Sequence, residues 1–96
     1  MTFSLAFVES ALKEWHKLPP PIRDQFKKKL AERLEHPDVP SARLHGMPDC
    51  YKIKLRTAGY RLVYQIEGKV AVVTVIAVGK RDKKRVYRVA AGRTGK

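Results

Sequence analysis

The sequence predicts a small α+β domain, in which a mainly antiparallel four-stranded sheet carries two N-terminal helices on one face and a short C-terminal helix follows. Three observations support this prediction. Apolar and polar residues alternate over 2–7 and 51–66, which is the period of a strand, whereas apolar residues between 8 and 34 recur at helical spacing. Val70–Val78 is apolar on both faces, as in a central strand. The expected order is β-α-α-β-β-β-α, in one domain spanning 1–96.

The N-terminal part contains a strand and two helices. A strand is expected over residues 2–7, and the first helix then follows from the spacing of Val8, Ala11, Leu12, Trp15 and Leu18. Glu14 falls on the opposite, polar face of this helix. The run Pro19-Pro20-Pro21 ends the first helix, and its last proline suits the first turn of a second. That second helix presents an i, i+4 stripe of Ile22, Phe26, Leu30 and Leu34 and ends near His36-Pro37.

The central feature is a predicted β-hairpin over Cys50–Tyr64. Its first strand places Tyr51, Ile53 and Leu55 on one face and the cations Lys52, Lys54 and Arg56 on the other. If the apolar sets of both strands face one core, Arg56 lies opposite Arg61, Lys54 opposite Val63, and Lys52 opposite Gln65. This register requires a loop of Ala58-Gly59 or of Thr57–Tyr60. Opposed cations repel, so the cationic face predicts an anionic ligand.

The remaining segments are assigned from turn residues and apolar runs. Residues 37–49 contain prolines and a glycine and are expected to form a loop, and Glu67-Gly68-Lys69 a turn. Gly79 is expected to end the last strand. The charge-dense segment 80–85 then leads to a short helix over 86–91, and residues 92–96 resemble a frayed tail.

Charge is concentrated in the second half of the chain. The net charge is +12, and residues 43–96 carry fourteen basic and three acidic side chains, against seven and six in residues 1–42. This asymmetry favours a nucleic-acid-facing half on a neutral scaffold; the alternative is a solvated basic surface that serves solubility. No transmembrane run, signal peptide, metal-ligand spacing or cofactor motif is present, and one cysteine excludes an internal disulfide. We expect a soluble, cytoplasmic protein without metal or cofactor.

The candidate site residues are cations and one tyrosine. Lys52, Lys54 and Arg61 share a strand face, and Lys80 and Arg81 end the neighbouring strand, so that together they can neutralise a scissile phosphate. The alternative is again a solvated strand face. Tyr87 follows a few residues later and is a candidate general base, although an isolated tyrosine is more often a rim residue of the core.

Four segments carry a resemblance to a known family: LHGMPDCYKIKLR at 44–56, GYRLVY at 59–64, VGKR at 78–81 and ALKEW at 11–15. The chain resembles the RelE toxins of bacterial RelE/RelB toxin–antitoxin pairs over nearly its whole length. The resemblance implies an endoribonuclease that cuts messenger RNA after the second nucleotide of the codon in the ribosomal A site. It implies attack by the ribose 2′-hydroxyl, which leaves a 2′,3′-cyclic phosphate and a 5′-hydroxyl.

The resemblance also implies roles and partners. Five positions match the catalytic set of the family: Lys52, Lys54, Arg61, Arg81 and Tyr87. We expect further contacts to messenger or 16S ribosomal RNA from His45, Arg56, Lys80, Lys83 and Lys84. His45 departs from the family prototype, which has arginine there. The implied partners are a RelB-like antitoxin, the ribosome with its messenger, and operator DNA only through the toxin–antitoxin complex. The alternatives are a gyrase-poisoning relative and a non-catalytic nucleic-acid-binding module.

Overall fold

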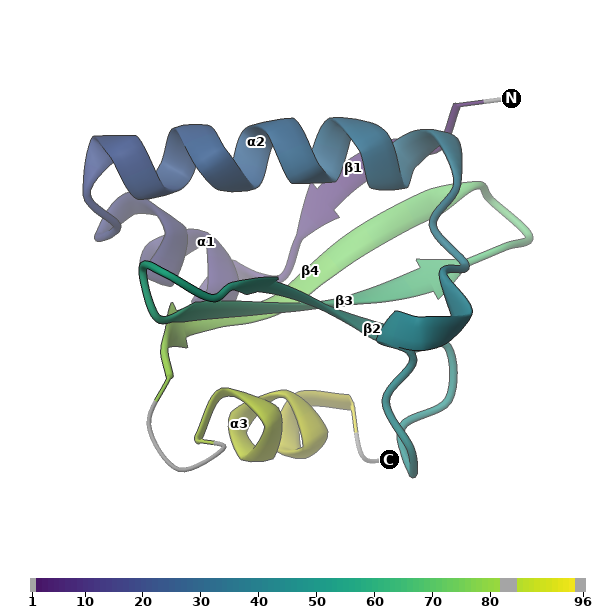
Figure 1. Ribbon diagram of the computed structural model, residues 1–96. Helices are drawn as coiled ribbons and strands as arrows, with labels where there is room; N and C mark the ends of the chain where they lie inside the picture. The colour runs from purple at the N-terminus through teal and green to yellow at the C-terminus, as the bar shows by residue number, and fades with distance from the viewer. Residues whose placement is uncertain (1, 82–84, 95–96) are drawn as a thin grey trace.

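The computed structural model describes residues 2–81 and 85–94 and contains the predicted order of elements (Figure 1). A short 3₁₀ helix, η1, adds to that order within the segment expected to be a loop. The elements are β1 (Ser4–Phe7), α1 (Glu9–His16), α2 (Pro20–Glu35), η1 (Pro40–Ala42), β2 (Cys50–Leu55), β3 (Tyr60–Glu67), β4 (Val72–Lys80) and α3 (Arg85–Thr94).

The four strands form one mixed sheet in the order β1-β4-β3-β2. The pairs β2–β3 and β3–β4 are antiparallel, and β1 runs parallel to β4. The prediction of a mainly antiparallel sheet is therefore confirmed, with one parallel pair at the β1 edge. The apolar strand β4 is central, as its composition predicted.

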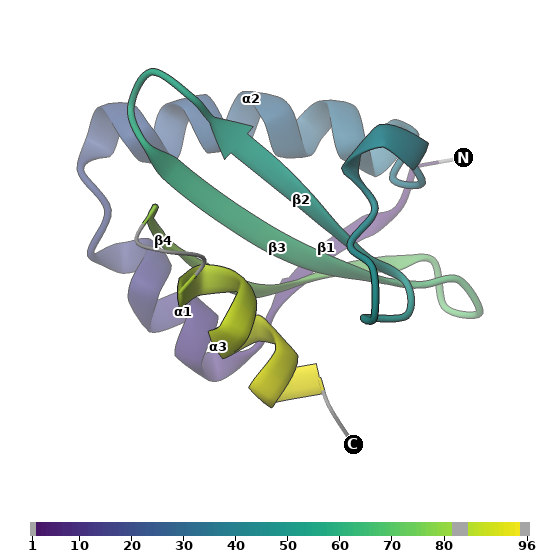
Figure 2. The same cartoon turned by 60° about the horizontal axis from the view of Figure 1, so that its bottom comes forward.

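Helices cover both faces of the sheet. α1 and α2 lie on one face, where Trp15, Phe26 and Leu30 pack against the inward side chains of the strands. The short helix α3 lies on the opposite face, against β3 and β4 (Figure 2). There Val86 and Ala90 join a second apolar cluster, which also contains Cys50, Val63, Ile76 and Ala77. The two clusters follow from the apolar character of β4 on both of its faces.

Several element ends differ from the sequence expectation: β1 begins at Ser4 and not at residue 2, β4 begins at Val72 and not at Val70, and two further differences lie near the C-terminus. α3 extends to Thr94, so residues 92–94 of the expected tail are helical; residues 95–96 lie outside the described chain. The Thr94 hydroxyl donates to the Ala90 carbonyl at 3.1 Å, and Arg93 is held by α1. These contacts stabilise a final turn that has no local sequence signal. The second difference is Gly79, which was expected to end a strand and instead lies within β4.

Candidate functional site

The β2–β3 hairpin has a different register from the one predicted. Lys54 lies opposite Arg61 and Lys52 opposite Val63, so the predicted pairs Arg56–Arg61, Lys54–Val63 and Lys52–Gln65 are wrong. The cause is the turn. Residues 56–59 form a four-residue turn, which is closed by a 2.8 Å hydrogen bond from the Gly59 N–H to the Leu55 carbonyl, with Gly59 at φ +74°. The observed register differs from the predicted one by an even number of residues. Each side chain therefore keeps its predicted face of the sheet.

The cations of the hairpin project from the face of the sheet that carries α3. Lys54, Arg61 and Gly79 lie side by side in one row across β2, β3 and β4. A Cβ atom added at Gly79 would lie 3.6 Å from Val86 Cγ2 of α3. Gly79 therefore lies beside Val86 of α3, where a Cβ would make an ordinary contact and a longer side chain would meet the helix.

Arg61 is a buried cation. Its side chain is only 7% exposed, and one of its N–H groups donates to the Tyr60 carbonyl at 2.9 Å. It forms no ion pair with any residue in 2–81 or 85–94. A guanidinium has five N–H donors, and burying its charge without an acidic partner is unfavourable. An anion that enters beside Arg61 would supply the missing charge and acceptors.

Lys52 and Lys54 increase the positive potential at the same place. Both side chains are half-buried. The neighbouring Lys52 ammonium lowers the pKa of Lys54 below its ordinary value, with smaller contributions from desolvation, Arg56 and Arg61. Lys54 therefore loses its proton more readily than an ordinary lysine, which is a useful property in a proton donor.

Tyr87 contributes a hydroxyl from α3. The ring packs against the apolar cluster that contains Val63, the cross-strand partner of Lys52. The hydroxyl is buried and has no hydrogen-bond partner among the described residues. A buried polar group without a partner is rare in folded proteins, and one explanation is a ligand that is absent from the structure.

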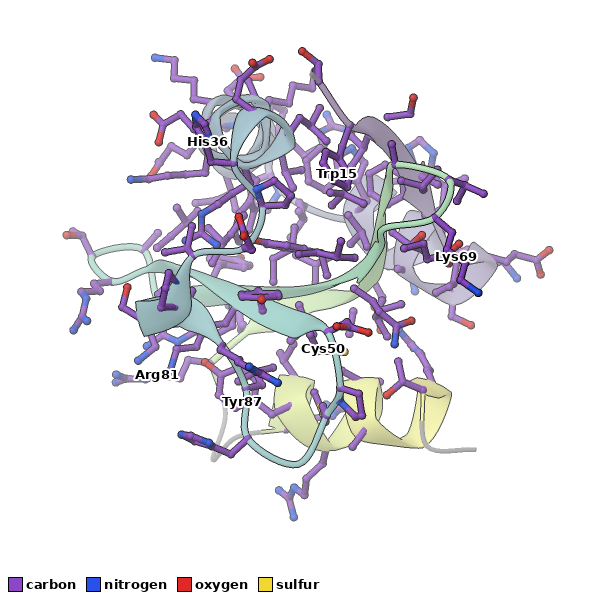
Figure 3. The ribbon with its side chains drawn as sticks, turned by 90° about the vertical axis from the view of Figure 1, so that its right-hand side faces the viewer. Trp15, His36, Cys50, Lys69, Arg81 and Tyr87 are labelled. Carbon is purple, nitrogen blue, oxygen red and sulfur yellow. The ribbon has the colours of Figure 1, made fainter. Side chains whose placement is uncertain are left out.

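Arg81 lies where β4 ends, and its exposed side chain is free to meet a large ligand. Its backbone N–H donates to the Gly59 carbonyl at 2.7 Å, which joins the end of β4 to the hairpin turn. Arg81 and Tyr87 both lie on the side of the sheet that carries α3 (Figure 3). A cleft of about 560 Å³ runs between α3 and the end of β4, lined by Gly79, Lys80, Arg81, Arg85 and Arg93, among others.

The structure therefore gathers all five predicted catalytic residues on one face. The predicted RNA-contacting residues are more dispersed: Arg56 lies in the hairpin turn, Lys80 ends β4, and His45 lies in the loop before β2, all three exposed. Leu44 and Met47 of that loop pack against the same cluster as Tyr87. Lys83 and Lys84 lie outside the described residues.

Sequence reasoning missed the ion pair that holds α3. Glu14 was assigned to the outer face of the first helix, but it accepts two hydrogen bonds from Arg93, at 2.9 and 3.0 Å. Arg93 also donates to the Ile76 carbonyl at 2.7 Å, and Glu14 accepts from the Val78 N–H at 3.2 Å. These bonds fix the last turn of the helix that carries Tyr87. Glu14 and Arg93 are 79 positions apart, so no local pattern predicts the contact.

In residues 2–81 and 85–94, no three histidine, cysteine, aspartate or glutamate side chains are grouped so as to hold a metal ion. No helix in the same ranges combines the length and apolar character needed to cross a bilayer.

Comparison with known proteins agrees with this geometry. The model of the family described as "ParE toxin of type II toxin-antitoxin system, parDE" matches residues 5–85. The mRNA interferase toxin RelE of Escherichia coli strain K12 is 56% identical, over 97% of this chain and 98% of its own length. This chain belongs to the RelE toxin family. The sequence resemblance is thereby confirmed, within the broader group that also contains the ParE toxins.

Solved structures support the membership of this RelE-family chain. A doubly substituted variant of the E. coli toxin RelE in the free state superposes with a TM-score of 0.90 at 55% identity, over 97% of this chain and 98% of that one. The toxin chain in the intact E. coli RelBE toxin–antitoxin complex gives a TM-score of 0.81 at 57% identity, over 84% and 99%.

Proposed function

We propose that this chain is the toxin of a type II toxin–antitoxin pair and an mRNA interferase that cuts messenger in the ribosomal A site. The observation that carries the proposal is a group of cations and one tyrosine hydroxyl on the face of the sheet that carries α3. Within residues 2–81 and 85–94, Arg61 is buried without an acidic partner and the Tyr87 hydroxyl has no hydrogen-bond partner, and Lys52 and Lys54 project from the same face of the sheet. The similarity to the mRNA interferase toxin RelE of E. coli supports the same activity.

The reaction is a transesterification within the RNA. The ribose 2′-oxygen attacks the adjacent phosphorus while the bond to the 5′-oxygen breaks, which leaves a 2′,3′-cyclic phosphate and a 5′-hydroxyl. The phenolate form of Tyr87 accepts the 2′-hydroxyl proton, and the Lys52 ammonium stabilises the negative charge of that phenolate. Arg61 and Arg81 hold the phosphate and stabilise the charge that develops on it.

Lys54 is the proton donor to the departing 5′-oxygen. Arg81 is the alternative donor, but a guanidinium has a pKa above about 12 and rarely gives up a proton. The pKa of Lys54 is lowered by Lys52, so this lysine is the better acid on physical grounds. The proton removed from the 2′-hydroxyl and the proton given to the 5′-oxygen balance over the reaction.

The ribosome is required because the toxin alone does not orient RNA. Arg81 is exposed and Lys52 and Lys54 are half-buried, so an RNA bound there stays open to solvent on one side and another body must align the reacting atoms. The exposed cations His45 (when protonated), Arg56 and Lys80 surround the site and are suited to ribosomal RNA or messenger. We also propose neutralisation by a RelB-like antitoxin, which binds operator DNA together with the toxin; complexes of related toxins with RelB support this partner.

A reconstituted translation reaction tests the proposal. Purified toxin is added to ribosomes translating a defined messenger, and primer extension maps the breaks. Breaks at one position within successive codons are expected, and the same messenger without ribosomes should stay intact. Breaks in DNA in the presence of gyrase would favour the gyrase-poisoning alternative. Salt-dependent RNA binding without cleavage would favour the non-catalytic one.

A further inference from the structure

Arg33 joins α2 to the strand that carries the two catalytic lysines. One of its terminal nitrogens, Nη1, donates to the Lys52 carbonyl at 3.1 Å and to the Tyr64 hydroxyl at 2.8 Å. Its guanidinium carbon lies 5.7 Å from the centre of the Tyr64 ring. Arg33 is half-buried and lies on the face of the sheet opposite to the candidate site.

The Lys52 carbonyl needs such a partner because β2 is an edge strand. Every second carbonyl of an edge strand points away from its neighbour and lacks a ladder hydrogen bond. Arg33 supplies the donor at Lys52, and the hydrogen bond ties the backbone of β2 to α2. The link is placed at the residue whose side chain projects toward the candidate site on the other face.

The far end of the link is anchored in the core. Tyr64 is fully buried, donates its hydroxyl proton to the Pro37 carbonyl at 2.6 Å and stacks on Tyr51 at a centroid distance of 5.7 Å. Burial raises the pKa of Tyr64, although Arg33 acts in the opposite direction. The phenol therefore stays protonated at neutral pH, accepts from Arg33 and donates to Pro37. The chain of bonds from Pro37 through Tyr64 and Arg33 to Lys52 is continuous.

Mutual repulsion makes this anchoring necessary. Lys52, Lys54 and Arg61 crowd one face of the hairpin, and β2 pairs with β3 along its length, with a further bridge to Arg43 at Tyr51 near its start. An edge strand that carries like charges tends to fray or move away from its partner. A tie on the other face opposes that movement without neutralising the cations.

We infer that Arg33 is a positioning residue, which holds the backbone of β2 at Lys52 so that the Lys52 and Lys54 ammonium groups stay side by side in the active site. This inference rests on the proposed function for its catalytic meaning, but its structural content concerns the toxin alone. Arg33 touches no reacting atom in this scheme. It acts through the position of Lys52.

The test measures the closeness of the two lysines directly. NMR titration of lysine side-chain carbons reports the pKa of Lys54, which the nearby Lys52 lowers in the wild-type protein. In Arg33→Met, which keeps the stem and loses the donors, the pKa of Lys54 should move up toward its ordinary value. Amide hydrogen exchange at Lys52 and Lys54 should become faster.

Two further variants separate geometry from charge. Arg23→Met removes a cation from the same helix without touching Lys52 or Tyr64 and should leave the pKa of Lys54 unchanged. Tyr64→Phe keeps the Arg33 charge but removes the hydroxyl that holds it, and should raise the pKa of Lys54 by a smaller amount than Arg33→Met. If Arg33→Met does not fold, Tyr64→Phe provides the test. An unchanged pKa of Lys54 in the folded Arg33→Met or Tyr64→Phe variant would overturn the inference.

Cleavage kinetics complete the experiment. Arg33→Met should lower kcat on ribosome-bound messenger on the order of 10-fold with little change in KM, because displaced catalytic groups lose alignment. Lys54→Ala serves as the reference for the proposed function. If that variant cleaves at the wild-type rate, the catalytic assignment is wrong, whereas the titration of Lys54 still decides whether Arg33 positions β2.

Discussion

Arg93 and Glu14 join the last turn of α3 to α1 through two parallel hydrogen bonds of 2.9 and 3.0 Å. The pair is partly buried, since the two side chains are 25% and 33% exposed. It closes the fold by tying its last helix to its first. Because α3 carries Tyr87, this contact also helps to place the hydroxyl that we propose as the base.

Loss of this ion pair should loosen α3. Arg93→Gln keeps most of the stem and removes the charge, and it should destabilise the protein by about 1–3 kcal/mol, since hydrogen bonds to charged groups are strong. Hydrogen exchange in α3 should become faster and cleavage slower, while exchange in β3 changes little. Lys13→Gln is the control, because its ion pair with Glu9 is exposed at 3.9 Å and contributes little. Equal exchange rates in α3 of Arg93→Gln and wild type would contradict this role.

Arg61 should favour function at the expense of stability. Arg61→Met replaces a buried charge, which has no acidic partner among the described residues, by an apolar chain of similar length. We expect unchanged stability or a gain of about 1 kcal/mol, because burying an uncompensated charge is unfavourable. Cleavage should fall on the order of 10²-fold or more with the loss of phosphate contacts. Denaturant unfolding and cleavage assays measure the two effects.

Arg56→Met is the matched control for Arg61. Arg56 is exposed in the hairpin turn, so its replacement should change stability by less than about 0.5 kcal/mol. Marked destabilisation of Arg61→Met would show that Arg61 is primarily a structural residue.

Gly79 should tolerate a methyl group but not a larger side chain. An added Cβ meets Val86 Cγ2 at an ordinary contact distance of 3.6 Å, and φ at Gly79 is not positive. Gly79→Ala should therefore be close to wild type, whereas Gly79→Leu should displace α3 and slow cleavage. Gly68→Leu is the control, since nothing lies within 4 Å of a Cβ there. Crystal structures or exchange rates of α3 distinguish the variants, and normal docking of α3 in Gly79→Leu would refute the prediction.

The pH dependence of cleavage should report the pKa of Lys54. A proton donor is lost as pH rises through its pKa, and the pKa of Lys54 is lowered chiefly by Lys52. The alkaline fall in rate should therefore begin at a lower pH than an ordinary lysine would give. In Lys52→Met the whole rate is lower, but this fall should move to higher pH. Lys69 lies in the turn at the other end of the sheet (Figure 3), so Lys69→Met should leave the pH of this fall unchanged. If the alkaline fall in rate occurs at the same pH in Lys52→Met as in wild type, Lys54 is excluded as the donor.

The sequence was sufficient for the faces of the strands and for the residues that share them. Alternation alone placed Lys52, Lys54 and Arg61 together, because the two-residue period of a strand does not depend on register. It was insufficient for the register itself. Residues 56–60 are compatible with hairpin turns of several lengths. The structure selects the four-residue turn that ends at Gly59, and this turn sets the register.

Contacts between residues that are far apart in the sequence could not be predicted either. Glu14 looked like a solvent-facing helix residue, and Arg93 looked like part of a frayed tail, because the partners of both lie far away in the sequence. Arg33 likewise reads as an ordinary surface arginine until β2 is placed beside α2. The burial of Arg61 is likewise not indicated by any local pattern, because its strand position alternates with apolar residues like that of an exposed cation.

Single-turnover cleavage of messenger on programmed ribosomes, compared for wild type and Tyr87→Phe, is the most direct test of the proposed mechanism. Wild-type toxin should leave a 2′,3′-cyclic phosphate within the A-site codon. Tyr87→Phe keeps the ring packed on the sheet and removes only the unpartnered hydroxyl, so it should bind ribosomes normally and cleave on the order of 10²–10⁴-fold more slowly. Cleavage by Tyr87→Phe at the wild-type rate would contradict the assignment of Tyr87 as the base.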